Sequence, residues 1–93
     1  MIDGRLVFTR SARVAFRRIG GQMVLVNTAD DTVLTLNDTG ALVWESLDGR
    51  NVEAIAQRVA SAFEVTPEQA LEDVGAFLAD LCSRALIHGG EGR

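Results

Sequence analysis

The chain has 93 residues, of which 47% are hydrophobic and 24% are charged, and its formal net charge is −4. This length suits one domain with a single core, and no apolar run approaches the roughly 18 residues that a membrane span requires. Because the first residues do not combine a basic region with a continuous apolar stretch, we expect a cytoplasmic protein without membrane contact.

Charge is distributed unevenly along the chain. Residues 1–18 contain five arginines and one aspartate, a local charge of +4, so the remaining residues must sum to −8. Residues 1–12 show no sustained periodicity apart from a short extended piece at Leu6 to Thr9, and residues 89–93 begin with a Gly-Gly pair. We therefore expect an N-terminal arm over residues 1–12, a folded domain over residues 13–88 and a disordered tail over residues 89–93.

The first half of the folded domain has the pattern of a small antiparallel sheet. Side chains alternate in polarity from Arg13 to Ile19, and Gly20-Gly21 then provides a two-residue turn. Met23 to Val26 is a continuous apolar run, and a polar turn separates it from a third β-rich run, Thr32 to Leu36. These runs predict a three-stranded meander, which needs a second layer to cover its apolar face.

The second half of the domain predicts three helices. The first is expected from about Thr39 to Leu47. Asn51 can cap a second helix whose apolar residues recur at three- and four-residue spacing, namely Val52, Ile55, Ala56, Val59 and Phe63. Thr66-Pro67-Glu68-Gln69 is a capping box with proline at the first helical position, and it predicts a third helix that ends near Ala85. The order β-β-β-α-α-α indicates an α+β fold with a winged helix-turn-helix-like arrangement.

Few side chains suit catalysis. The chain has one histidine, His88, which follows the last predicted helix, and one cysteine, Cys82, which lies beside that helix's apolar stripe. These two residues are too few for a metal site built from Cys and His, and no glycine-rich phosphate-binding motif is present. We therefore expect no enzyme activity, no cofactor and no metal site.

The winged arrangement raises the alternative of a DNA-binding regulator. A recognition helix normally carries Lys and Arg, because it must meet the phosphates of the duplex. The segment from Glu64 to Arg84 instead has five carboxylates against one arginine, a charge of −4. Since this surface would repel DNA, nucleic acid is not expected as a partner, and the regulator remains the rival interpretation.

The sheet offers a different kind of site at its edge. If the strands lie in chain order, the third strand has one free edge where an extended peptide can add as a further strand. The residues of that strand are Thr32, Val33, Leu34, Thr35 and Leu36. Four or five backbone hydrogen bonds contribute about 5 kcal/mol, whereas micromolar affinity needs about 8 kcal/mol. An apolar pocket beside the edge must supply the difference.

The third predicted helix can form the wall of such a pocket. Asp73, Phe77 and Asp80 stand at positions i, i+4 and i+7, so they lie on one helix face beside the core stripe. Phe77 would anchor an apolar side chain, and the two carboxylates favour a peptide that carries Lys or Arg. The alternatives are ordinary core packing for Phe77 and a solvated surface for the two aspartates.

In these features the chain resembles the PqqD-like family, also described as RiPP recognition elements, where RiPP denotes a ribosomally synthesised and post-translationally modified peptide. The resemblance spans residues 14–87. Its motifs are Leu36-Asn37 with Thr39-Gly40, Val43-Trp44-Glu45, Leu47-Asp48-Gly49, Val52 to Ile55, Asp73-Val74, and Phe77-Leu78 with Leu81. It implies a protein without catalytic activity that binds the leader segment of a precursor peptide. In relatives the leader adds to the third strand and lies against the third helix, which here correspond to Thr32–Leu36 and to Asp73, Phe77 and Asp80.

The resemblance leaves the pathway and the partner enzyme open. A lasso-peptide system would pair the chain with a separate leader peptidase, whereas a pyrroloquinoline-quinone (PQQ) chaperone would pair it with a radical SAM enzyme. We favour a lasso or another RiPP pathway, because the arginine-rich arm departs from the quinone branch. A third alternative is a structural subunit that docks on a larger enzyme through the arginine arm.

Overall fold

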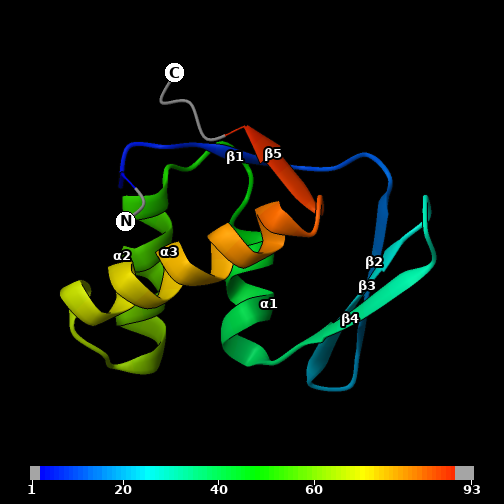
Figure 1. Cartoon of the computed structure of the whole chain (residues 1–93). Coiled ribbons are helices and arrows are strands. Elements are labelled where there is room, and N and C mark those ends of the chain that lie inside the picture. Colours follow the sequence, from blue (N-terminus) through cyan, green and yellow to red (C-terminus); the bar gives the residue numbers. More distant parts are fainter. Residues whose placement is uncertain (1–2, 90–93) are drawn as a thin grey trace.

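The computed structural model describes residues 3–89. Its elements, in chain order, are β1 (Phe8–Arg10), β2 (Val14–Ile19), β3 (Gln22–Asn27), β4 (Thr32–Leu36), α1 (Asp38–Glu45), α2 (Val52–Phe63), α3 (Pro67–Ser83) and β5 (Ile87–Gly89). The sheet β2-β3-β4 lies at one end and α2 lies toward the other, with α1 between them, while α3 crosses α2 and runs toward α1 (Figure 1). This confirms the predicted α+β fold with a three-stranded sheet before three helices. No helix within the described residues is long and apolar enough to cross a membrane.

The three-stranded sheet is an antiparallel meander whose register follows from its first turn. Gly20 has φ +61°, a conformation that glycine adopts without steric cost, and Ile19 pairs with Gln22 across this turn. In the next pair of strands Leu25 lies opposite Leu34. Because side chains alternate between the two faces, these leucines share the face that packs against the helices.

The core joins the sheet to the helices through α1. Trp44 is completely buried, and its ring meets that of Phe16 edge to face with centroids 5.6 Å apart. Arg18 on β2 also forms an ion pair of 3.1 Å with Glu45, so β2 and α1 are held together on this side. The fully buried large side chains are Trp44, Leu25, Ile55, Leu78, Leu81, Leu86, Ile87, Val43, Val52 and Val74.

Each helix begins at a side-chain cap. Asn37, Asn51 and Thr66 accept hydrogen bonds from backbone N–H groups three residues further on, at 2.8 to 3.1 Å. The predicted starts of α2 and α3 are thereby confirmed, and α1 begins at Asp38, one residue earlier than expected. α1 also ends at Glu45, before the predicted Leu47, although Leu47 remains buried in the core.

The end of α3 differs slightly from the prediction. The helix ends at Ser83, and Ala85 takes a left-handed conformation with φ +60°. The N–H of Leu86 donates to the carbonyl of Leu81, and the N–H of Ala85 donates to that of Cys82, which together form a Schellman motif. The helical pattern could not show this stop, because glycine usually occupies the left-handed position. The motif turns the chain into β5.

The segment predicted as an N-terminal arm forms part of the fold. β1 pairs antiparallel with β5, which places Thr9 opposite His88, and Phe8 is only 6% exposed. His88, which follows the last predicted helix, therefore lies in a paired strand at the end of the domain. Gly89, predicted to lie in the tail, ends β5, while residues 90–93 lie outside the described residues.

The same N-terminal segment completes the start of α2. The backbone N–H groups of Val52 and Glu53 donate to the carbonyls of Leu6 and Gly4, each at 2.9 Å, and the N–H of Ala54 in the same turn donates to Oδ1 of Asn51. The first N–H groups of a helix have no partner within the helix, so these contacts satisfy donors that would otherwise need water. β1 and the residues before it therefore contact two elements that lie far along the chain, the strand β5 and the start of helix α2.

Candidate functional site

β4 forms one edge of the three-stranded sheet. It pairs with β3 on one side, and within residues 3–89 no strand pairs with its other side. At its start the backbone N–H of Thr32 donates to Asp30 at 3.0 Å, and hydrogen bonds from Thr32 hold the pKa of Asp30 below its ordinary value. This hydrogen bond fixes the turn before β4. The strand therefore starts at a defined point, and its other edge is unpaired in the described part of the chain.

The register decides which residues of β4 offer backbone groups at that edge. The pair Ile19–Gln22 closes a two-residue turn and is a hydrogen-bonded pair, and bonded and non-bonded pairs then alternate along the ladder. The N–H and C=O of a β3 residue point to the same side of the strand, so a β3 residue that bonds to β2 cannot also bond to β4. The β3 partner of Leu34 does not bond to β2, and Leu34 therefore directs its own N–H and C=O toward β3. Val33 and Thr35 therefore direct theirs outward, where another strand could pair with them.

A groove lies beside this edge, between β4, α1 and α3. It encloses about 310 Å³ and is lined by Leu34, Thr35, Leu36, Asn37, Thr39, Gly40, Val43, Asp73, Val74, Phe77 and Asp80. Of the residues predicted for the site, the structure thus brings Leu34 to Leu36 together with Asp73, Phe77 and Asp80. Thr32 and Val33 lie further along the strand, outside this lining.

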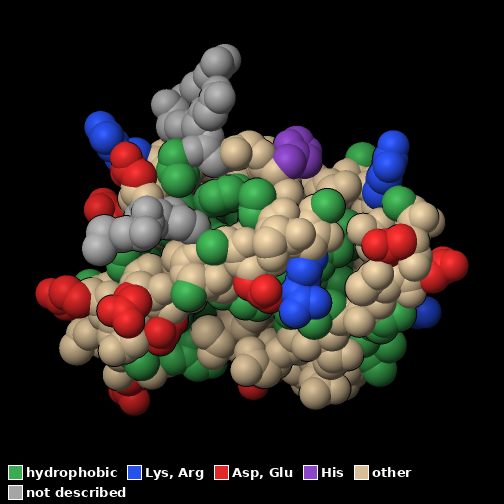
Figure 2. Space-filling view, viewed as in Figure 1, with side chains coloured by type: hydrophobic (Ala, Val, Ile, Leu, Met, Phe, Trp, Pro, Cys, Tyr) green, Lys and Arg blue, Asp and Glu red, His purple; other side chains and the backbone are tan. Residues whose placement is uncertain are grey.

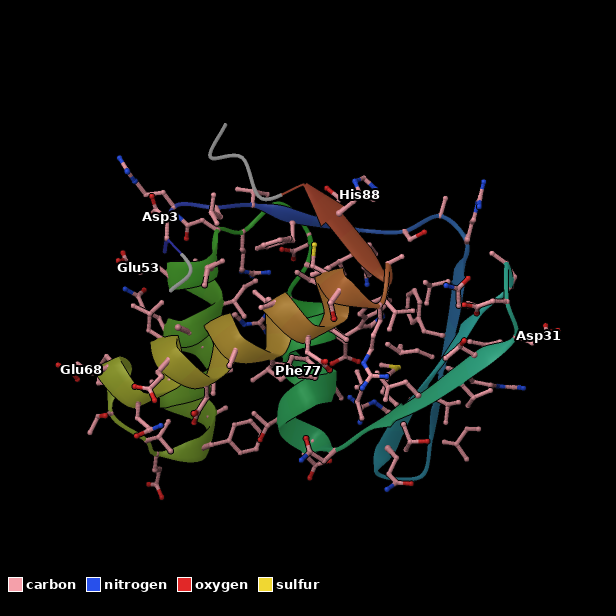
Figure 3. The ribbon with its side chains drawn as sticks, viewed as in Figure 1. Asp3, Asp31, Glu53, Glu68, Phe77 and His88 are labelled. Atoms are coloured by element: carbon pink, nitrogen blue, oxygen red, sulfur yellow. The ribbon has the colours of Figure 1, made fainter. Side chains whose placement is uncertain are left out.

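Phe77 stands on the side of α3 that faces α1 (Figure 3). Its side chain is half-buried and packs against the core without being enclosed by it. A Cβ added to Gly40 would lie 3.3 Å from Cζ of Phe77 and 3.2 Å from Cβ of Leu36. Glycine therefore lets the first turn of α1 approach both the strand and the ring, and this contact forms the inner wall of the groove.

The first turn of α1 was missing from the predicted site. Asn37, Thr39 and Gly40 follow β4 directly, and the bend from strand to helix brings them back against the groove. The available signal was the immediate succession of Leu36 and the N-cap Asn37, since the first residues of a helix that starts there lie close to the end of the edge strand.

The groove has two carboxylates along α3. Asp73 accepts a hydrogen bond of 2.9 Å from Nε2 of Gln69, and Asp80 accepts one of 3.0 Å from Nε of Arg84. Acidic side chains also gather on the end of the molecule formed by α2 and α3 (Figure 2). Within residues 3–89, no three His, Cys, Asp or Glu side chains are grouped so that they could hold a metal ion. The groove is therefore apolar at its base and acidic along one rim.

Two solved structures share this fold. One, described as "TbiB1 in Complex with the TbiA(beta) Leader Peptide", gives a TM-score of 0.83 at 24% identity and covers 89% of this chain and 98% of that chain. The other, "Lasso peptide synthetase B1 complexed with the leader peptide", gives a TM-score of 0.80 at 27% identity and covers 87% and 96%. Both likenesses extend over almost the whole of the solved chains.

The family comparison agrees with the fold. No curated protein matches the sequence significantly. The sequence profile of the family described as "Coenzyme PQQ synthesis protein D (PqqD)" matches residues 22–87. This stretch contains β3, β4 and all three helices, and hence every residue that lines the groove. The chain therefore belongs to the PqqD family, as its resemblance over residues 14–87 predicted.

Proposed function

We propose that this protein is a non-enzymatic adaptor that captures the leader segment of a ribosomally synthesised precursor peptide. The leader adds as a strand to β4, and the adaptor presents the rest of the precursor to a modifying or processing enzyme in the cytoplasm, where precursors are made. The observation that carries this proposal is the joint lining of one groove by an open strand edge and by Phe77. A solved relative with 27% identity is described as complexed with a leader peptide.

Two features of the geometry support this proposal. Val33 and Thr35 each offer one N–H and one C=O, so a leader strand can form up to four hydrogen bonds, worth about 4 kcal/mol in total. Micromolar affinity needs about 8 kcal/mol, and a buried apolar anchor adds about 1.5 to 3 kcal/mol. The apolar base of the groove, formed by Leu36, Val43 and Phe77, can accept more than one such side chain.

The similarity to a lasso peptide synthetase B1 favours a lasso-type pathway, with a leader peptidase as the partner enzyme. The description of the family supports a second candidate, a chaperone of PQQ biosynthesis that serves a radical SAM enzyme. A DNA-binding regulator fits poorly, because the segment from Glu64 to Arg84 carries five carboxylates against one arginine and would repel phosphates.

Replacing Val33 with proline tests strand addition directly. Proline lacks the N–H that Val33 turns to the free edge, so the leader would lose one hydrogen bond and keep an unpaired carbonyl. We expect binding to weaken by about 1 to 3 kcal/mol in a titration with a synthetic peptide that carries the leader of the cognate precursor.

The control is Val33→Ala, which keeps the N–H and shortens a side chain that is 60% exposed. It should bind the leader almost as the wild type does. Equal affinities for the proline and alanine variants would contradict addition at β4. Failure of the folded wild-type protein to bind the leader at high micromolar concentration would overturn the proposed function.

A further inference from the structure

The two carboxylates of the groove differ in charge balance. Asp73 is hydrogen-bonded to the neutral amide of Gln69, so that position keeps a charge of −1. Asp80 forms an ion pair with Arg84, with 3.0 Å between Nε and Oδ2, so that position is neutral as a pair. Although the two aspartates look equivalent in sequence, a cation in the groove would be attracted chiefly to Asp73.

The same leader side chain cannot reach both carboxylates. Asp73 and Asp80 are seven residues apart on α3, which corresponds to about 10 Å along the helix axis. An extended peptide advances about 3.3 Å per residue, so the two aspartates face different leader residues. Each therefore acts on its own position of the bound peptide, with Phe77 between them.

We propose that Asp73 selects a Lys or Arg in the leader, and that Arg84 neutralises Asp80 so that the facing leader position is not selected for positive charge. This inference rests on the proposed function and specifies the chemistry of the peptide that the groove accepts. The ligand is an extended segment with an apolar anchor for the Phe77 wall and one cationic residue on the Asp73 side.

The expected selectivity is modest, because both carboxylates are accessible to solvent. Asp80 and Arg84 are 51% and 47% exposed, and an exposed ion pair changes an equilibrium by only about twofold to fivefold. A leader cation at Asp80 would have to displace Arg84 or lie beside it, so it would gain little there. The preference at Asp73 should also weaken as salt is added.

A displayed library of random peptides tests the inference independently of the natural leader's own sequence. Selection on the wild-type protein should enrich Lys or Arg at one position, with an apolar residue two positions away on the same face of the strand. Selection on Asp73→Asn should lose that enrichment but keep the apolar one, and an individual selected peptide should bind about twofold to fivefold more weakly. Glu72→Gln is the matched control, because Glu72 is an exposed neighbouring carboxylate outside the groove lining, and its selection should equal that of the wild type.

Arg84→Gln tests the second half of the inference. Removing the arginine frees the charge of Asp80, so a second basic position should appear in the selected peptides, with a gain of about twofold to fivefold in affinity for peptides that carry it. Arg50→Gln is the control, since Arg50 also pairs with a nearby aspartate, Asp48, but lies outside the groove lining. It should select the same peptides as the wild type.

The outcomes separate this inference from the proposed function. If folded wild-type protein enriches no extended peptide, peptide binding by the groove is itself wrong. If it enriches apolar peptides with no basic position that depends on Asp73, only the charge selection is overturned. If Asp80→Asn weakens binding of the same basic peptides as much as Asp73→Asn does, or if Arg84→Gln adds no basic position, the role given to Arg84 is overturned.

Discussion

Replacing Phe77 with alanine is expected to weaken leader binding by about 1 to 3 kcal/mol, which is roughly fivefold to 150-fold in affinity. The ring is half-buried against α1 and lines the groove, so its removal takes away the apolar wall without opening the centre of the core. The variant should therefore stay folded. Titration with the leader peptide, beside a thermal melt of each variant, measures both effects.

The matched control for this prediction is Phe63→Ala. Phe63 lies at the end of α2, is 39% exposed and does not line the groove, so the same change in side chain should leave leader affinity unaltered. Unchanged affinity of a folded Phe77→Ala variant would exclude Phe77 from the peptide-binding wall, although strand addition at β4 could still hold.

Replacing Phe8 with alanine is expected to lower the free energy of unfolding by about 3 to 5 kcal/mol. Phe8 is 6% exposed, belongs to the core and lies in β1, where it pairs with the last strand of the described chain. A loss of this size is a large fraction of the stability of a small domain, so the variant should unfold at a markedly lower denaturant concentration than the wild type. Chemical denaturation followed by circular dichroism measures the change.

Phe16→Ala provides the comparison for Phe8, because Phe16 is 47% exposed and contacts Trp44 through one ring edge. It should cost clearly less than Phe8→Ala. A Phe8→Ala variant as stable as the wild type would show that β1 does not contribute to the folded core. Since β1 does not line the groove, the folded fraction of this variant should still bind the leader.

Much of the fold follows from patterns that are local in the sequence. The alternation before Gly20-Gly21, the capping residues Asn51 and Thr66, and the proline at the start of α3 each act within a few residues. They predicted the meander, two of the three helix starts and the order of the elements. The spacing of Asp73, Phe77 and Asp80 likewise placed them on one helix face.

Contacts between distant segments could not be inferred in this way. β1 has only three residues, and its strand character depends on pairing with β5 and on hydrogen bonds to the start of α2. The role of Gly40 appears only when α3 brings Phe77 within van der Waals distance of α1. No local pattern contains such information, because it depends on where another part of the chain packs.

The sequence by itself determined an edge strand over Thr32–Leu36, an aromatic helix face for its partner wall, and an acidic balance that disfavours DNA. Only the tertiary structure decided that β4 and this helix face enclose one groove, and that Val33 and Thr35 turn their backbone groups outward. It also showed that Asp80 forms an ion pair with Arg84, whereas Asp73 accepts a hydrogen bond from the neutral amide of Gln69. The physical reason is that register, packing of helices on a sheet and pairing of charges are relations between elements, whereas periodicity and capping are properties of one element.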